Sequence, residues 1–213
     1  MARSRGQSLR KGRRKGFRRQ FGLDRSGPPP RQTRPGQPLR PWTIPNAVGY
    51  IRLAGLPVFL YLAFSSGDGR SAAAAVIFWL IAMGDYVDGF LARATGQYSR
   101  MGAILDPIVD RLTILSGVAV CWHFELLPRW ALAVLVAREA ITALLAEIAL
   151  RRIGELQINW LGRIAVVPVM ASIFFAMVSD SWVWSAMLIV GLVIGILGTI
   201  AYVRAGMRQL ATA

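Results

Sequence analysis

The chain has 213 residues, of which 54% are hydrophobic and 17% charged, and its mean hydropathy is +0.45. This composition excludes an ordinary soluble domain and favours a helical membrane protein. The single cysteine, Cys121, excludes a disulfide framework within the chain. The formal net charge of +14 is unevenly distributed, because residues 1–40 contain 13 of the 25 Lys and Arg and one acid, Asp24.

Residues 1–40 are rich in Arg, Gly, Pro, Gln and Ser. A segment of this composition buries too little apolar surface to fold, so we predict a disordered polybasic tail. It lacks the apolar stretch of a secretory signal peptide. We expect the tail to stay in the cytoplasm and to contact anionic lipid. Because it has almost no aromatic residues for stacking on bases, we expect no nucleic-acid partner.

Six apolar segments follow, each close to the ~20 residues that a membrane-spanning helix needs. They cover residues 44–64, 71–93, 100–122, 130–150, 160–179 and 182–203. The predicted fold is therefore all-α, with one integral membrane domain of six transmembrane helices over residues 41–213. Most Arg residues beside the segment ends fall on the same side as the tail. This predicts a multi-pass protein of a bacterial-type plasma membrane with both termini in the cytoplasm.

The last apolar segment contains Gly191 and Gly195, which have the spacing of a G-x-x-x-G pair, and Gly198. Small residues at this spacing let two helices approach closely. A homodimer contact through this segment is therefore an open alternative.

Four carboxylates interrupt the second and third apolar segments. Asp85 and Asp88 are three residues apart, and Asp106 and Asp110 are four apart, so each pair lies on one helix face. An ionised Asp at the centre of a bilayer costs roughly 2.5–3.5 kcal/mol on insertion scales, so four of them need a bound cation or a water-filled cavity. Oxygen ligands without His or Cys favour Mg²⁺ or Mn²⁺. The orientation predicted from the Arg residues also places the cluster toward the cytoplasmic ends of the two helices.

Small residues and one cation complete the pattern around these acids: Gly89, Ala92, Arg93 and Gly102. The whole pattern, D-x2-D-G-x2-A-R-x8-G-x3-D-x3-D, resembles the signature of the CDP-alcohol phosphotransferases, and every fixed position is filled. The resemblance covers roughly residues 42–205. Buried ion pairs, or a proton path in a transporter, would also explain the acids, but neither predicts the Gly, Ala and Arg positions.

The resemblance implies transfer of a phosphatidyl group from CDP-diacylglycerol to an alcohol at a two-metal site, with release of CMP. It implies that Asp85, Asp88 and Asp106 are metal ligands. Asp110 would be a fourth ligand and the general base toward the acceptor hydroxyl. The residues implied to form the pocket for the CDP moiety are Asn46, Gly89, Ala92, Arg93 and Gly102.

The first apolar segment opens with Pro45 and Asn46, and Arg52 follows six residues after Asn46. Many relatives begin similarly, with a further proline where this chain has Pro57. We expect Asn46 to help order the site. For Arg52 two readings stay open: binding of the acceptor through contact with a substrate phosphate, or snorkelling of its side chain to the membrane surface.

Three arginines in the later segments are candidates for binding a phosphorylated acceptor: Arg138, Arg163 and Arg204. A charged residue within a span is a site candidate by default, and the guanidinium group suits phosphate. The alternative is that Glu139 and Glu147 pair with these arginines as structural ion pairs.

Relatives that use glycerol 3-phosphate often have a Gly-Lys pair followed by Lys-Thr at the start of their fifth helix. Here the run over residues 162–166 is Gly-Arg-Ile-Ala-Val, which keeps the Gly and one cation but lacks the second Lys and the Thr. We expect glycerol 3-phosphate first, giving phosphatidylglycerophosphate. Phosphatidylglycerol, giving cardiolipin as in actinobacterial-type members, comes second, and an inositol phosphate comes third.

Two functions of other classes remain open at this point. An ion or proton transporter using the aspartates predicts transport without CMP release. A membrane anchor predicts that deletion of residues 1–40 abolishes function while alanine at Asp110 does not.

Overall fold

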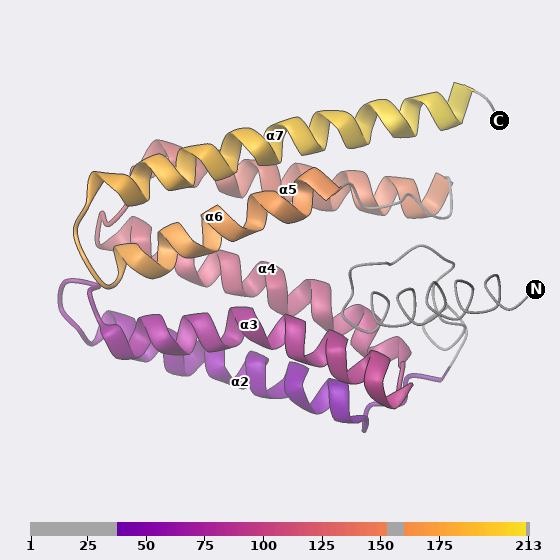
Figure 1. The fold of residues 1–213 in the computed structure, drawn as a ribbon, viewed down its shortest axis with the longest axis horizontal. Helices are drawn as coiled ribbons and strands as arrows, with labels where there is room; N and C mark the ends of the chain where they lie inside the picture. Colours follow the sequence, from indigo (N-terminus) through magenta and orange to yellow (C-terminus); the bar gives the residue numbers. More distant parts are fainter. Residues whose placement is uncertain (1–37, 153–159, 212–213) are drawn as a thin grey trace, which may run out of the picture. The chain divides into compact units, whose positions relative to one another are not determined.

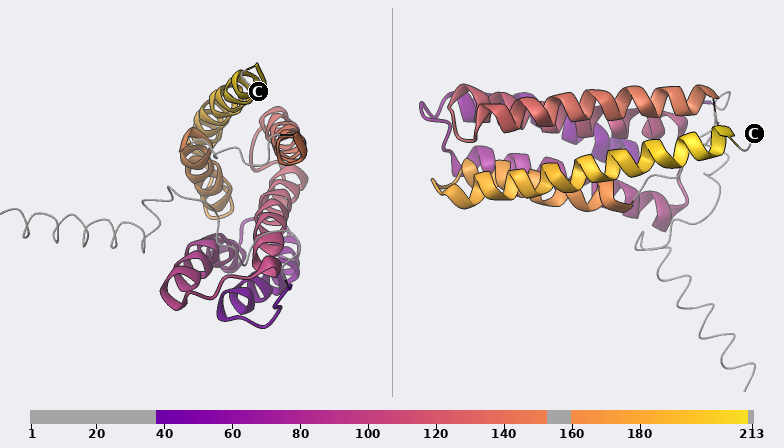
Figure 2. Two further views of the ribbon diagram at one scale, coloured as in Figure 1. Left: turned by 90° about the vertical axis from the view of Figure 1, so that its right-hand side faces the viewer. Right: turned by 90° about the horizontal axis from the view of Figure 1, so that it is seen from above.

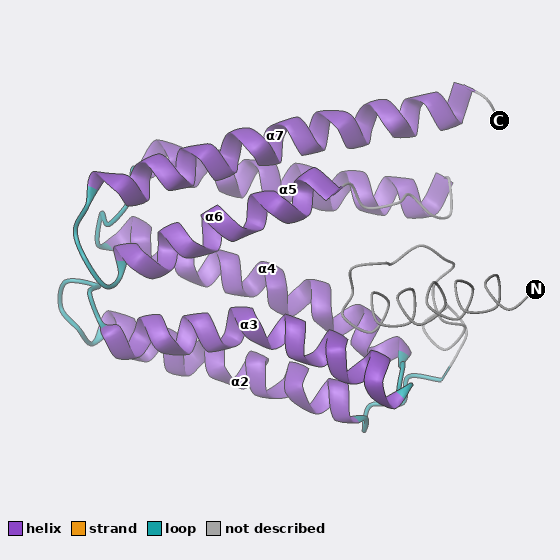
Figure 3. Cartoon of the chain, viewed as in Figure 1, coloured by secondary structure: helices purple, strands orange, loops and turns teal. Residues whose placement is uncertain are grey.

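The computed structural model describes residues 38–152 and 160–211 (Figure 1). Every regular element in these two ranges is an α-helix (Figure 3). The helices are α2 (Ile44–Phe64), α3 (Ala72–Thr95), α4 (Arg100–His123), α5 (Arg129–Arg152), α6 (Trp160–Ala176) and α7 (Trp182–Ala211). Residues 1–37, which make up most of the predicted tail, lie outside the described residues.

All six apolar segments are confirmed as helices, and the bounds of the first four agree with the prediction to within two residues. α6 ends three residues early, at Ala176, because the amides of Val178 and Ser179 both turn back to the Phe175 carbonyl. α7 continues eight residues beyond the predicted end, to Ala211. Apolar character stops near Arg204, but helix formation does not depend on it.

The apolar helices mark a membrane protein. Within the described residues, three stretches are long and apolar enough to cross a membrane: α2, α3 and Trp182–Arg204 of α7. The apolar part of α6 is shorter, over Ile164–Ala176. α4 and α5 carry more charged residues, among them two of the four motif aspartates on α4. Three of the six predicted spans therefore meet this standard on length and composition.

The chain divides into two compact units, and the division falls within α2, α3 and α4. The first unit comprises Met1–Gly55 and Leu80–Asp110, and the second comprises Leu56–Trp79 and Arg111–Ala213. All residues of the D-x2-D…D-x3-D motif belong to the first unit.

In the first unit, the segment before α2 is tied to neighbouring elements by backbone groups. The Met101 amide of α4 donates to the Leu39 carbonyl at 3.0 Å. The Ile44 amide, at the first position of α2, donates to Oε1 of Gln97 at 3.1 Å. Pro45 suits the first turn of α2, where no amide hydrogen is needed. These bonds place the start of α2 beside the start of α4.

In the second unit, a buried apolar core surrounds a glycine of α4. Phe78 and Ile173 are almost fully buried. A Cβ added to Gly117 would lie 2.8 Å from a side-chain carbon of each of them. The ring of Phe59 packs against that of Phe78, with centroids 5.3 Å apart. Only glycine fits at position 117 without moving buried side chains.

The glycines of α7 are used for contacts within the chain. α6 and α7 lie side by side in both views of Figure 2. A Cβ at Gly191 would lie 2.7 Å from Val169 of α6, and one at Gly195 would lie 3.2 Å from the Arg138 guanidinium of α5. The close approach that a G-x-x-x-G pair allows is therefore made here to α6 and α5.

The packing around Gly117 predicts that Gly117→Val destabilises the protein by about 1–3 kcal/mol, because the added carbons overlap Phe78 and Ile173. The measurement is the thermal unfolding midpoint of the purified protein in detergent. Ala119→Val is the matched control, because Ala119 is exposed on the same helix. Equal midpoints for the two variants would contradict the packing described.

Candidate active site

The centre of the motif is a guanidinium group surrounded by carboxylates. Nη1 of Arg52, on α2, donates to Oδ2 of Asp88 at 3.0 Å, and Nη2 donates to Oδ1 of Asp110 at 2.5 Å. Nη1 also lies 3.9 Å from Oδ1 of Asp85. The remaining nitrogen, Nε, donates to the Ile81 carbonyl of α3 at 2.8 Å. One side chain of α2 therefore joins α3 and α4.

The carboxylates differ in their access to solvent. The side chain of Asp88 is 5% exposed, and that of Arg52 is 3% exposed. The side chains of Asp85 and Asp110 are 42% and 44% exposed. Asp88 is thus held in the interior by its bond to Arg52, whereas Asp85 and Asp110 can be reached by a ligand.

Asp106 completes the set of acids. Its charge acts on those of Asp85 and Asp88 across the two helices, and also on that of Asp110. The Arg52 guanidinium alone cannot balance four ionised carboxylates, which favours a further cation at the site. The donor set consists of carboxylate oxygens from two facing helices, which is the chemistry that Mg²⁺ and Mn²⁺ prefer.

The donor chemistry fits a divalent cation, but the carboxylates are not drawn together around one point. Among the described residues, no three His, Cys, Asp or Glu side chains are grouped closely enough to hold a metal ion. The closest contacts of Asp88 and Asp110 are instead those to Arg52. The structure thus brings three of the four predicted residues, Asp85, Asp88 and Asp110, to within 3.9 Å of the Arg52 guanidinium.

Two of the residues predicted to bind the CDP moiety share a face of α3. Gly89 and Arg93 are one turn apart, and a Cβ at Gly89 would lie 3.2 Å from Nη1 of Arg93. Gly89 thus leaves space for the Arg93 guanidinium. Ala92, on the same helix, is partly exposed. The face that carries Asp85 and Asp88 therefore continues into a stretch with small side chains and one cation.

The other two predicted CDP-binding residues, Asn46 and Gly102, contact each other. Asn46 is buried, and its Nδ2 donates to the carbonyls of Arg40 and Pro41 at 3.1 and 3.0 Å. Its Oδ1 accepts from the Ser99 hydroxyl at 2.9 Å. A Cβ at Gly102 would lie 2.8 Å from that Oδ1. In this structure the pair joins the starts of α2 and α4.

Sequence reasoning did not single out Ser99 and Gly84. Ser99 is the N-cap of α4, because its hydroxyl accepts from the Gly102 amide at 2.9 Å. The sequence did contain a signal for this N-cap, since a serine stands directly before the predicted helix start. Gly84 is buried against the stem of Arg52, and a Cβ there would lie 2.6 Å from Cδ of Arg52. A glycine before Asp85 in an apolar run carried no such signal.

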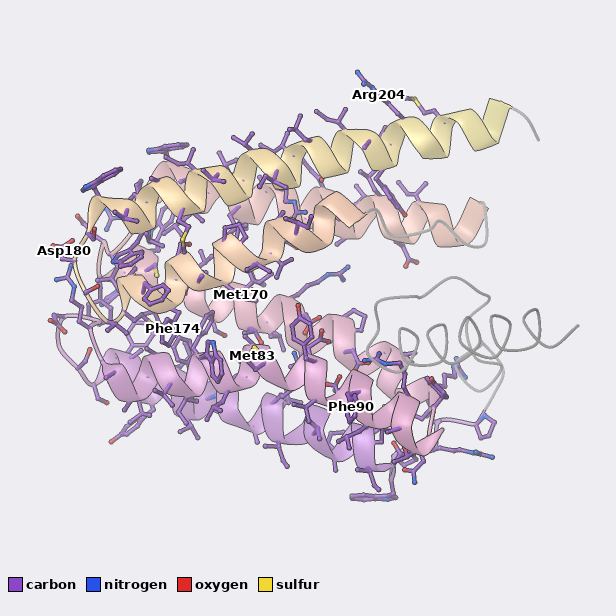
Figure 4. The ribbon with its side chains drawn as sticks, viewed as in Figure 1. Met83, Phe90, Met170, Phe174, Asp180 and Arg204 are labelled. Carbon is purple, nitrogen blue, oxygen red and sulfur yellow. The ribbon has the colours of Figure 1, made fainter. Side chains whose placement is uncertain are left out.

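Besides Arg52, the three predicted acceptor-binding arginines of the later helices lie in the second unit, and they differ in environment. The side chain of Arg138 is 13% exposed and pairs with the neighbouring Glu139, while its buried Nε has no hydrogen-bond partner in the described part of the chain. Arg204 is exposed and extends away from α7 (Figure 4). The side chain of Arg163 lies outside the described residues. Glu147 is exposed on α5.

Comparisons with known proteins agree with the motif. The family model for CDP-alcohol phosphatidyltransferase matches residues 42–197. A Streptomyces coelicolor protein named cardiolipin synthase (CMP-forming) is 41% identical over 68% of this chain and 70% of its own length. The CDP-diacylglycerol–glycerol-3-phosphate 3-phosphatidyltransferase of Bacillus subtilis is 30% identical over 58% of this chain and 70% of its own. The Escherichia coli K12 protein of the same name is also 30% identical, over 62% of this chain and 75% of its own length.

The contact between Asn46 and Gly102 predicts that Gly102→Ala destabilises the protein by about 1–3 kcal/mol, since the new methyl displaces a buried, hydrogen-bonded amide. The measurement is the thermal midpoint in detergent. Gly89→Ala is the matched control, because its Cβ meets only the flexible end of Arg93. A midpoint for Gly102→Ala at or above that of Gly89→Ala would argue against the packing role.

Proposed function

The chain belongs to the CDP-alcohol phosphatidyltransferase family, and from that premise we propose that it transfers a phosphatidyl group from CDP-diacylglycerol to an alcohol. In this reaction the acceptor hydroxyl oxygen forms a bond to the phosphorus that carries the diacylglycerol. The bond from that phosphorus to the oxygen of CMP breaks, and CMP leaves. The hydroxyl proton passes to a base.

The observation that carries this proposal is the gathering of Asp85, Asp88 and Asp110 around Arg52, with Asp106 close by. Members of the family generally use a divalent metal. We assign Asp85, Asp88, Asp106 and Asp110 as ligands for Mg²⁺ or Mn²⁺. When bound, such ions neutralise phosphoryl oxygens and lower the barrier to attack. The excess negative charge of the cluster supports this assignment.

Asp110 is the proposed base. Its side chain is 44% exposed, so an acceptor hydroxyl can approach it. Arg52 holds only Oδ1, which leaves Oδ2 to take the proton. A base must come within hydrogen-bonding distance of the proton that it removes, and a fixed carboxylate satisfies this more readily than a mobile one.

The face of α3 beyond the aspartates is the proposed pocket for the CDP moiety. Gly89 and Ala92 leave space beside the carboxylates, and Arg93 presents a cation suited to a pyrophosphate. We assign Asn46 and Gly102 a supporting role at this pocket, because they hold the starts of α2 and α4 together.

Phosphatidylglycerol is the acceptor that we propose first. The relative named cardiolipin synthase is 41% identical, against 30% for the relatives named for glycerol 3-phosphate. The phosphodiester of phosphatidylglycerol carries one negative charge, whereas a phosphomonoester carries up to two. The single cation at Arg163, in place of the two in many glycerol 3-phosphate enzymes, fits the smaller charge.

Glycerol 3-phosphate is the second candidate. The observation in its favour is that the relatives named for glycerol 3-phosphate are 30% identical to this chain.

The proposed location follows from the charge pattern. We propose six membrane spans in a bacterial-type plasma membrane, with both termini and the aspartates on the cytoplasmic side. Residues 41–213 would form the membrane domain, and the basic tail before it would lie on anionic lipid.

The acceptor is identified by CMP release from CDP-diacylglycerol with Mg²⁺ or Mn²⁺ and one acceptor at a time. We expect the fastest release with phosphatidylglycerol, slower or no release with glycerol 3-phosphate, and none with inositol phosphate. Asp110→Ala should lose nearly all activity, since general-base catalysis alone contributes typically 10²–10⁴-fold.

Asp68→Ala is the matched control, because Asp68 is an exposed acid outside the first unit. It should release CMP at the wild-type rate. CMP release by Asp110→Ala at that rate would remove Asp110 from the reaction. Release with glycerol 3-phosphate alone would reverse the order of the two acceptors, and release with neither, nor with inositol phosphate, would overturn the proposed reaction.

A further inference from the structure

We propose that Arg52 is a positioning residue that orients Asp88 and Asp110 and thereby sets the divalent-cation affinity of the aspartate cluster. The inference rests on the proposed function in one respect, which is the assignment of the aspartates as cation ligands. It adds a residue on another helix, outside the D-x2-D…D-x3-D motif, that this affinity depends on.

The guanidinium group of Arg52 holds its three partners in fixed directions. Its three nitrogens bond three separate groups, namely the Ile81 carbonyl, Asp88 and Asp110, at 2.8, 3.0 and 2.5 Å. The fork is planar and rigid, so its bonds fix the direction of each acceptor as well as its distance. A lysine ammonium has no such fork and could not reproduce this arrangement.

Arg52 and Asp88 are both buried. Arg52 and Asp88 are 3% and 5% exposed, so breaking their bond leaves an uncompensated charge away from water. The anchor on the Ile81 carbonyl belongs to the turn of α3 that precedes Asp85. The guanidinium is therefore held on the backbone of the same helix that carries two of the acids.

Arg52 bonds one of the two carboxylate oxygens of Asp88 and one of those of Asp110. Arg52 uses Oδ2 of Asp88 and Oδ1 of Asp110, one oxygen from each. These bonds leave Oδ1 of Asp88 and Oδ2 of Asp110 outside the contact with Arg52, and they fix the direction of both carboxylate groups. Partners that orient metal ligands in this way raise metal affinity.

Gly84 of α3 leaves the space that the stem of Arg52 occupies. A Cβ at Gly84 would lie 2.6 Å from Cδ and 2.7 Å from Cγ of Arg52. Any side chain at position 84 would therefore displace the stem and, with it, the guanidinium. Gly84 and Arg52 together specify one position for the positive charge.

A second effect of Arg52 acts in the opposite direction. A guanidinium near a metal site repels the cation, and it could also compete with it for the same oxygens. Loss of Arg52 would then tighten cation binding, whereas loss of a positioning residue weakens it. A purely structural role would lower stability and leave cation affinity unchanged. The sign of the change in cation affinity therefore distinguishes a positioning role, charge repulsion and a purely structural role.

The experiment is a Mn²⁺ titration of the full-length protein in detergent, with free Mn²⁺ measured by electron paramagnetic resonance. For Arg52→Gln we expect affinity to fall roughly 10–100-fold, as for other residues that orient metal ligands. Gly84→Ala should weaken binding in the same direction while it keeps every charge. If Arg52→Gln does not fold, Gly84→Ala carries the test.

Arg70→Gln is the matched control, because it removes an arginine paired with an aspartate, Asp180, in the second unit. It should leave Mn²⁺ affinity unchanged. Unchanged or tighter Mn²⁺ binding in both Arg52→Gln and Gly84→Ala would overturn the inference and leave the proposed function standing. Absence of Mn²⁺ binding by the wild type would overturn the cation assignment itself, and the inference with it.

Discussion

The candidate site depends on one buried interaction between a guanidinium group of α2 and carboxylates of α3 and α4. Charges of this kind are unfavourable away from water unless each has a well-oriented partner. Arg52 supplies that partner for Asp88 and Asp110, but four acids exceed what one cation can balance. The remaining negative charge is what makes a divalent cation the natural further component of the cluster.

Glycines accommodate the polar side chains that cross between helices in the first unit. Gly84 makes room for the stem of Arg52, and Gly102 makes room for the amide of Asn46. Gly89 does the same for Arg93. The glycines of the motif therefore have a packing role beside any role in admitting a nucleotide. Because the space around an added Cβ differs among these glycines, they should tolerate substitution by alanine to different degrees.

The sequence predicted the helices well because apolar runs of spanning length have few competing interpretations. α2 begins and ends at the predicted residues. The end of α7 was missed because apolarity says little about where a helix stops once it leaves the apolar region. The end of α6 was missed because the chain turns at the Phe175 carbonyl while the sequence is still apolar. The spacing of the acids predicted that each pair shares a helix face, and the structure brings Asp85 and Asp88 of α3 and Asp110 of α4 to Arg52.

The role of Arg52 could not be predicted from the sequence in the same way. Its partners are 29, 36 and 58 residues away along the chain, on two other helices. Local spacing contains no information about such contacts, so phosphate contact and snorkelling stayed equally open. An exposed fraction of 3% does not fit snorkelling. The use of every guanidinium nitrogen within the chain favours a positioning role over contact with a phosphate.

Anomalous X-ray diffraction from crystals grown with Mn²⁺ would show whether the aspartates hold a cation while Arg52 stays bonded to two of them. We expect a Mn²⁺ peak bounded by carboxylates of α3 and α4, with Arg52 still bonded to Asp88 and Asp110. A peak in the place of the Arg52 guanidinium, with that side chain turned away, or no peak at the aspartates, would contradict the claim.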